Sequence, residues 1–135
     1  MVGLPGDSEK IAVNTTNKVS VVKVLIFDGE GSMEESVAGI EACLDESNTE
    51  NLSSGSYFDY DTASTINSNT LSGYDILIMP GGNSATYISS TSINEDAIKQ
   101  FLNRGNGYVG ICAGAYAASN SVDGSYSGWG LASHV

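Results

Sequence analysis

The chain has 135 residues, 16 of them acidic and 5 basic, so its formal net charge at pH 7 is −11. This length suits one domain with one hydrophobic core, and a hydrophobic content of 41% excludes a chain that is disordered throughout. Such an acidic protein repels phosphate backbones and anionic lipid, so nucleic acids and membranes are excluded as favoured partners.

The first half of the chain predicts an arm, a strand and a helix. Residues 1–18 are rich in Gly, Ser, Thr and Asn without an apolar period, which predicts a flexible arm. Val19–Phe27 is an almost continuous β-branched and apolar run, typical of a strand buried in a parallel sheet. After a loop with two glycines, Ser32 is predicted to cap a helix over Met33–Asp45. We expect Cys43, on the apolar side of this helix, to be a core residue.

The second half continues the alternation of strands and helices. We predict a short peripheral strand at Tyr57–Asp61, a buried strand at Asp75–Met79, a helix at Glu95–Arg104, a core strand at Gly107–Ile111 and a small-residue helix at Ala115–Ser119. This alternation indicates an α/β domain whose parallel sheet is covered by helices on both faces. Several aromatic side chains are expected to be exposed and to line a ligand crevice or a dimer face: Tyr87, Tyr116, Tyr126 and Trp129.

Each of the three apolar strands ends in a Gly-rich turn that carries a chemically useful group. The first turn contains Glu30, the second the pair Gly81 and Gly82, and the third Cys112. Because the carboxyl ends of strands frame the ligand crevice in open α/β sheets, we expect these groups to lie at one site.

The run Gly110-Ile111-Cys112-Ala113-Gly114 predicts a nucleophile elbow, a sharp turn from strand to helix with a reactive side chain at its tip. Such a turn needs small neighbours, which Gly110 and Gly114 provide. The amides and the positive dipole end of the following helix favour a thiolate. The alternative interpretation is a buried, unreactive cysteine in a tight glycine turn.

The other two turns also allow two interpretations each. An amide of Gly81-Gly82 fits a loop that points a donor at a developing oxyanion, or the pair marks an ordinary tight turn. The carboxylate of Glu30 is placed to share a proton with the cysteine sulfur, or it is a solvated loop acid.

The sequence indicates no cofactor and no metal. It has neither a P-loop nor a G-x-G-x-x-G run that opens a helix after the first strand. Its two cysteines lack a histidine pair at ligand spacing, which argues against a zinc site. The acidic, Ser-, Thr- and Asn-rich composition favours an exported domain, with a cytoplasmic protein as the alternative, and the location stays unknown.

The runs Ile78–Gly82 and Val109–Tyr116 resemble the class I glutamine amidotransferase-like superfamily. The closer similarity is to the amidotransferase-like domain at the amino terminus of fungal biotin–protein ligases, which also occurs alone in archaea and bacteria. Val24–Gly31, the run Glu35-Ser36-Val37 after it, and Gly128–Leu131 resemble that group too. The resemblance implies a three-layer, flavodoxin-like α/β fold with helices on both faces of a parallel sheet and a nucleophile elbow at a strand end. We therefore expect one amidotransferase-like domain over residues 19–135, shortened relative to the superfamily.

The resemblance also implies roles for individual residues. Cys112 would be the nucleophile, and the amides of Gly82 and Ala113 would form the oxyanion hole. Glu30 would match the acid that the protease/deglycase branch places beside its cysteine. His134, the only histidine, lies at about the distance at which that branch keeps a histidine, and would be the base. Glutamine amidotransferases use a His-x-Glu downstream of the elbow, and its absence here argues against glutaminase activity.

Two functions remain open at this point. In the first, the protein is an enzyme that hydrolyses or transfers the acyl group of a small amide, ester or carbonyl adduct through Cys112. In the second, it is a non-catalytic module that binds a ligand or a protein segment, or a thiol redox sensor. The acidic surroundings of Cys112, without Lys or Arg nearby in sequence, raise a thiol pKa and favour the second. The expected partner is a small molecule, with self-association into a homo-oligomer as a further expectation.

Overall fold

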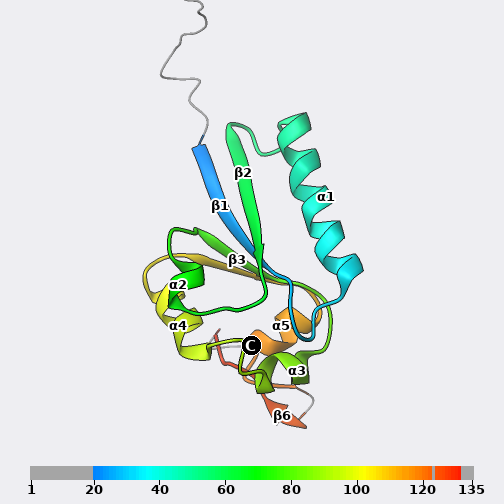
Figure 1. Cartoon of the computed structure of the whole chain (residues 1–135), viewed down its shortest axis with the longest axis vertical. Coiled ribbons are helices and arrows are strands. Elements are labelled where there is room, and N and C mark those ends of the chain that lie inside the picture. Colours follow the sequence, from blue (N-terminus) through cyan, green and yellow to red (C-terminus); the bar gives the residue numbers. More distant parts are fainter. Residues whose placement is uncertain (1–19, 123, 132–135) are drawn as a thin grey trace, which may run out of the picture.

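The computed structural model describes residues 20–122 and 124–131, and it contains a four-stranded parallel sheet flanked by helices (Figure 1). The strands are β1 (Ser20–Phe27), β2 (Ser56–Ala63), β3 (Ile76–Met79) and β4 (Gly107–Gly110), in the spatial order β2-β1-β3-β4. The helices are α1 (Glu34–Glu50), α2 (Ser68–Leu71), α3 (Ser84–Ser89), α4 (Glu95–Asn103) and α5 (Ala113–Ala118). A short antiparallel pair, β5 (Ser121–Val122) and β6 (Tyr126–Ser127), follows. The predicted α/β parallel sheet is confirmed, whereas the predicted arm at 1–18 lies outside the described residues.

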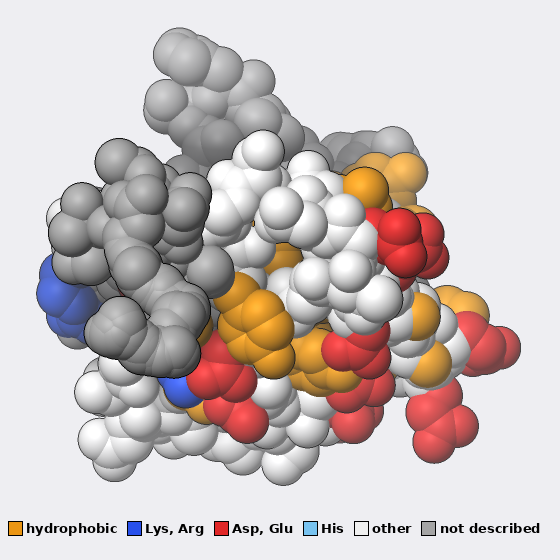
Figure 2. Space-filling model, turned by 90° about the horizontal axis from the view of Figure 1, so that it is seen from above, with side chains coloured by type: hydrophobic (Ala, Val, Ile, Leu, Met, Phe, Trp, Pro, Cys, Tyr) orange, Lys and Arg blue, Asp and Glu red, His pale blue; other side chains and the backbone are white. Residues whose placement is uncertain are grey.

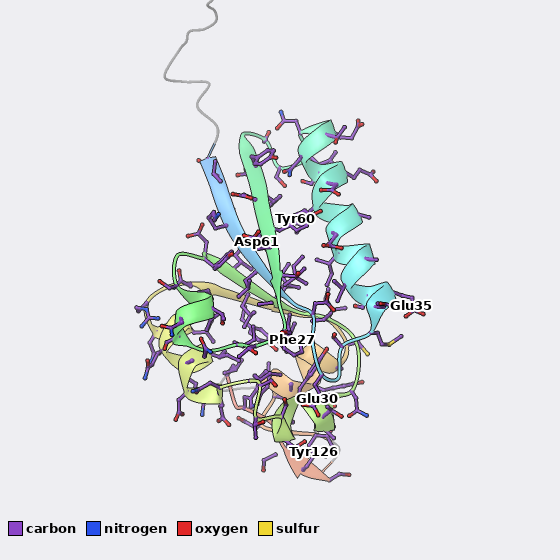
Figure 3. All side chains as sticks on the ribbon, in the orientation of Figure 1. Phe27, Glu30, Glu35, Tyr60, Asp61 and Tyr126 are labelled. Carbon is purple, nitrogen blue, oxygen red and sulfur yellow. The ribbon has the colours of Figure 1, made fainter. Side chains whose placement is uncertain are left out.

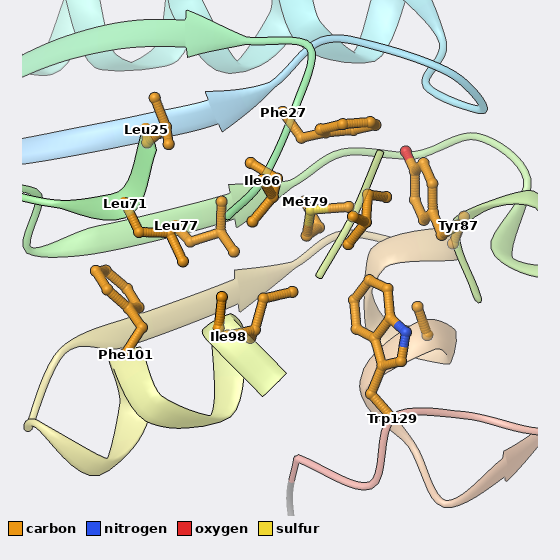
Figure 4. Packing of buried hydrophobic residues seen from close by; sticks show 14 residues of the cluster. Leu25, Phe27, Ile66, Leu71, Leu77, Met79, Tyr87, Ile98, Phe101 and Trp129 are labelled. Atoms are coloured by element: carbon orange, nitrogen blue, oxygen red, sulfur yellow. The ribbon is translucent and has the colours of Figure 1, made fainter. Parts of the chain in front are cut away.

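The sheet forms a core on each face because its central strands are apolar on both sides. On one face, Leu25 and Phe27 of β1 and Leu77 and Met79 of β3 pack against residues of the helices α2 to α5 (Figure 4). On the opposite face, a smaller cluster joins the other side chains of β1 and β3 to α1, with these buried members: Val24, Ile26, Val37, Ile40 and Ile78. Adjacent residues along each strand therefore serve different cores, as expected for a strand buried on both faces.

Helix α1 differs from the prediction at its start and on one of its faces. Its N-cap is Met33, which makes no side-chain cap, so the predicted Ser32 cap is wrong. The Ser32 hydroxyl is used within the preceding loop, where it donates to the Gly29 carbonyl and accepts from the Gly29 amide. The expectation that Cys43 is a core residue is also wrong, because its free thiol is exposed. Cys43 lies at the margin of the helix face that packs on the sheet, where α1 does not extend over β4.

The segment after β6 closes the end of α5. The last carbonyls of a helix lack partners within the helix. Here the Trp129 amide donates to the Ala117 carbonyl at 2.7 Å, and the Leu131 amide donates to the Ala118 carbonyl at 2.9 Å. The Trp129 side chain is 3% exposed and packs in the larger core. This segment therefore fixes α5, and with it the start of α5 beside β4.

The strand order brings three strand ends together. From β1 the chain first crosses to β2 on one side and then returns to place β3 on the other side of β1. In open α/β sheets, ligands bind outside the carboxyl ends of the strands at such a reversal point. The carboxyl ends of β1, β3 and β4 are neighbours at this edge, which makes it the first place to look for a functional site.

The surface carries many acidic and few basic side chains. On the face seen in Figure 2, Asp and Glu side chains are spread widely and Lys and Arg side chains lie toward one side. Among the described residues no helix is both long and apolar enough to cross a membrane.

Candidate functional site

The loops that follow β1 and β3 are joined by backbone hydrogen bonds. The Met33 amide donates to the Gly81 carbonyl at 3.0 Å, and the Asn83 amide donates to the Gly31 carbonyl at 2.9 Å. The third strand end reaches the same place, since a side-chain carbon built on Gly81 would lie 3.9 Å from the Cβ of Cys112. The carboxyl ends of β1, β3 and β4 therefore form one compact site.

Cys112 occupies the turn between β4 and α5 in a backbone conformation that residues with a side chain rarely adopt. Its φ is 51° and its ψ is −105°, and its thiol is free and exposed. The Ile111 amide still pairs with the Met79 carbonyl at 3.0 Å, whereas the Gly114 amide already bonds back to the Ile111 carbonyl at 2.9 Å. The chain thus passes from strand to helix within a single residue, and that residue bears the strain.

The two glycines beside Cys112 allow β4 and α5 to approach each other closely. A Cβ on Gly110 would lie 2.7 Å from the Gly114 carbonyl oxygen, and a Cβ on Gly114 would overlap the Met79 carbonyl. The Tyr108 hydroxyl donates to the Gly114 carbonyl at 2.5 Å, and burial raises the pKa of this phenol. The turn is therefore held by contacts that leave no space for larger residues on either side of the cysteine.

Two backbone amides at the site are not used by the fold. Within residues 20–122 and 124–131, neither the Gly82 amide nor the Ala113 amide donates to a protein acceptor. Ala113 is the first residue of α5, where an N–H has no partner within the helix. A Cβ on Gly82 would overlap the Gly31 carbonyl, so this loop can approach its neighbour only as glycine.

Ser36 joins the first turn of α1 to the loop after β3, and the sequence analysis assigned no role to it. Its hydroxyl accepts a hydrogen bond from the Gly81 amide at 2.8 Å. A Cβ built on Gly81 would lie 3.3 Å from the Ser36 hydroxyl oxygen and 3.9 Å from the Cβ of Cys112. Ser36 and Cys112 therefore both lie close to Gly81. A serine in the first turn of a helix is too common to stand out, and only the contact between α1 and β3 reveals this position.

Tyr87 is buried beneath the site, so the expectation that it is exposed is wrong. Its ring packs edge-on against Phe27 with the centroids 5.6 Å apart, and its hydroxyl donates to the Pro80 carbonyl at 2.9 Å. Burial, with a smaller contribution from the charge of a Cys112 thiolate, raises the pKa of Tyr87 to about 12. Tyr87 therefore supports the loop after β3 from inside the core.

The other three aromatic residues expected at the surface differ in their exposure. Trp129 is buried, contrary to the expectation, because it packs in the core beneath α5. Tyr116 is 56% exposed, as expected. Tyr126 is half-buried, and its hydroxyl makes a 2.5 Å hydrogen bond with the Ser84 hydroxyl.

The carboxylate of Glu30 is exposed, at the end of the molecule where Tyr126 also lies (Figure 3). It accepts a hydrogen bond from the Ser90 hydroxyl at 2.9 Å, which ties the loop after β1 to the segment between α3 and α4. In the described part of the chain, no hydrogen bond joins this carboxylate to the Cys112 thiol. His134, the predicted base, lies outside the described residues.

Comparison with known proteins gives one match. The model of the family described as "Biotin-protein ligase, N terminal" matches residues 22–128, which include most of β1, all of β2, β3 and β4, and Cys112. No curated protein and no solved structure matches the chain significantly. No group of three or more His, Cys, Asp or Glu side chains among the described residues is arranged to hold a metal ion.

Proposed function

The chain belongs to the biotin-protein ligase N-terminal family, and on this basis we propose that it is a thiol-dependent hydrolase or acyl transferase with Cys112 as its nucleophile. One observation carries the proposal: an exposed thiol on a strained turn lies at the start of α5, where the Ala113 amide has no acceptor in the described part of the chain. In this proposal the turn is the nucleophile elbow of a flavodoxin-like domain.

The proposed substrate is a small amide, ester or carbonyl adduct. For an ester, the Cys112 thiolate attacks the carbonyl carbon and forms a C–S bond, while the carbonyl oxygen becomes an oxyanion. The amides of Gly82 and Ala113 donate to that oxygen. Collapse of the intermediate breaks the bond to the leaving alcohol, which takes up a proton. Water then hydrolyses the thioester, which releases the carboxylic acid and returns the thiol.

Proton transfer in this scheme is assigned to Glu30 and His134. Glu30 receives the thiol proton or holds the carboxyl proton beside the sulfur, and His134 acts as the base in the second step. The Glu30 carboxylate accepts a hydrogen bond from the Ser90 hydroxyl, so its proposed role at the sulfur requires it to exchange this partner.

The pH dependence of Cys112 alkylation tests the proposal. We would measure it in a Cys43→Ala variant, with Cys112→Ala as the reference in which only the exposed Cys43 thiol reacts. We expect Cys112 to be alkylated faster than Cys43 at neutral pH, and we expect this advantage to be lost in Glu30→Gln. Equal alkylation rates for Cys112 and Cys43 at every pH, with no change in Glu30→Gln, would refute the proposed chemistry.

A second candidate function is a non-catalytic binding module or a thiol redox sensor. The binding module is favoured by the bond between Glu30 and Ser90, which gives the carboxylate a role in the fold, and by the acidic surface, which disfavours a thiolate. Steady turnover of p-nitrophenyl acetate that is lost in Cys112→Ala would exclude this alternative. Reversible oxidation of Cys112 without any turnover would support it.

A further inference from the structure

A groove of about 430 Å³ runs between α1 and the sheet. One wall is the stretch of α1 from Ser36 to Leu44, and the other is formed by Ile78 of β3 and Ile111 at the end of β4. Of the residues that the structure describes, none with a charged side chain lines it. We call this feature the α1–β4 groove.

The groove exists because α1 covers only part of its face of the sheet. α1 packs over β1, β2 and β3 through the smaller core, and it leaves β4, the last strand in the sheet order, uncovered. Val109 of β4 is paired with Ile78 in the parallel register and is 44% exposed, and Ile111 is 40% exposed. Side chains two residues apart on a strand point to the same face, so these two residues extend the apolar surface of the groove.

The groove begins at the candidate site. Ile111 lines it and directly precedes Cys112 in the chain. Ser36 lines it at the same end and binds the Gly81 amide, beside the Cβ of Cys112. An acyl group whose carbonyl lies at the sulfur therefore has the groove as the adjacent apolar space.

The length and charge of the groove indicate its occupant. From Ser36 to Leu44, α1 rises about 12 Å, which suits an extended chain of medium length. α1 carries acidic residues and no basic residue, and the whole chain has a net charge of −11. Two copies that met along α1 would bring like charges together, and a free fatty-acid anion would be repelled. An uncharged acyl group meets neither penalty.

We propose that the α1–β4 groove binds the apolar acyl portion of a neutral ester or amide whose carbonyl is presented to Cys112. This inference rests on the proposed function, and it narrows the substrate class to acyl compounds with a medium-length apolar chain. Cys43, an exposed thiol in the groove wall, serves as a built-in reporter of occupancy.

Binding is tested without any chemistry at Cys112. In Cys112→Ala, Cys43 is the remaining cysteine, and its alkylation rate is measured with octanamide or acetamide present. We expect octanamide to slow the reaction about tenfold or more at saturation, because its methylene groups leave water, and acetamide to have no effect. The matched control places a thiol at another exposed apolar position, by Leu52→Cys in a protein that also carries Cys43→Ala and Cys112→Ala. Octanamide should not change the alkylation rate of this thiol.

Two results would overturn the assignment of the groove. The first is a Cys43 alkylation rate that octanamide leaves unchanged. The second is protection that rises with protein concentration without octanamide, which would assign the groove to a second copy of the chain.

Ester reactivity separates this inference from the proposed function. In the Cys43→Ala variant, p-nitrophenyl octanoate should acylate Cys112 about tenfold faster than the acetate ester, after correction with a free thiol in solution. Failure of both esters to react would refute the proposed function. The protection of Cys43 by octanamide would then still show whether the α1–β4 groove binds an apolar acyl chain. Equal reaction of both esters, with no protection of Cys43, would refute the groove and retain the nucleophile.

Discussion

Replacement of Cys112 by glycine should leave the protein more stable than replacement by alanine, the reverse of the usual order. The conformation of Cys112, with φ 51° and ψ −105°, is one that a residue with a Cβ holds only at a cost of about 1–3 kcal/mol. At a relaxed position, glycine is less stable than alanine by about 0.4–1 kcal/mol, because the unfolded chain gains freedom. The thiol is exposed, so neither change opens a cavity. The glycine variant should therefore be favoured by about 1 kcal/mol.

Urea denaturation of the two variants, analysed for equal slopes, measures this difference. The matched control is Ala115→Gly at an exposed position within α5, which should lose about 0.5–1 kcal/mol. If Cys112→Gly is less stable than Cys112→Ala by the amount seen in the control, the turn is relaxed. The strain that distinguishes Cys112 would then be absent, and the argument for an elbow would lose its geometric basis.

Three further predictions concern Gly114 beside the turn, Gly39 in the groove wall and Tyr87 beneath the site. Gly114→Ala should cost about 1–3 kcal/mol, because the new methyl group overlaps the Met79 carbonyl, and equal stability by urea denaturation would contradict this packing. Gly39→Ala, in open space on α1, should instead gain about 0.5–1 kcal/mol, and a loss would mean that the groove wall is not open. Tyr87→Phe should cost about 1–3 kcal/mol, because the Pro80 carbonyl loses its buried donor. The pKa of Tyr87 is raised to about 12, so the stability that this side chain contributes is present below pH 10 and is lost as the pH approaches 12. An absorbance titration checks this, and a Tyr87→Phe variant that still shows every late-titrating phenol of the parent protein would refute it.

The sheet could be predicted because each central strand has a recognisable pattern in its own short stretch of sequence. Continuous apolar runs at β1 and β3 have no other stable placement than a sheet buried on both faces. The end of α1 could not be predicted in the same way. The helix continues through polar residues to Glu50 because Asn48 bonds both the amide and the carbonyl of Phe58, at 2.8 Å each. That contact joins α1 to the edge strand β2, and the spacing of apolar residues along α1 does not reveal it.

The residues around Cys112 were less predictable than the strand ends themselves. Tyr87 lies in a helix of six residues, too short for an apolar period to show which side faces the core. Cys43 fits the apolar period of α1, yet its thiol is exposed. It lies at the margin of the packed face of α1, on the side where this helix does not extend over β4, the last strand of the sheet. A helical pattern shows which residues share a face, but not how far the neighbouring layer extends.

The strain at Cys112 bears on whether its side chain has a function at all. The fold needs a sharp turn between β4 and α5, and a glycine would form that turn without strain. The exposed thiol contributes no buried packing and no hydrogen bond among the described residues, so the fold gains nothing from a side chain at this position. A side chain that costs stability and adds none is best explained by what it binds or reacts with. This argument holds for both the enzyme and the redox sensor, and turnover of p-nitrophenyl acetate that is lost in Cys112→Ala separates the two.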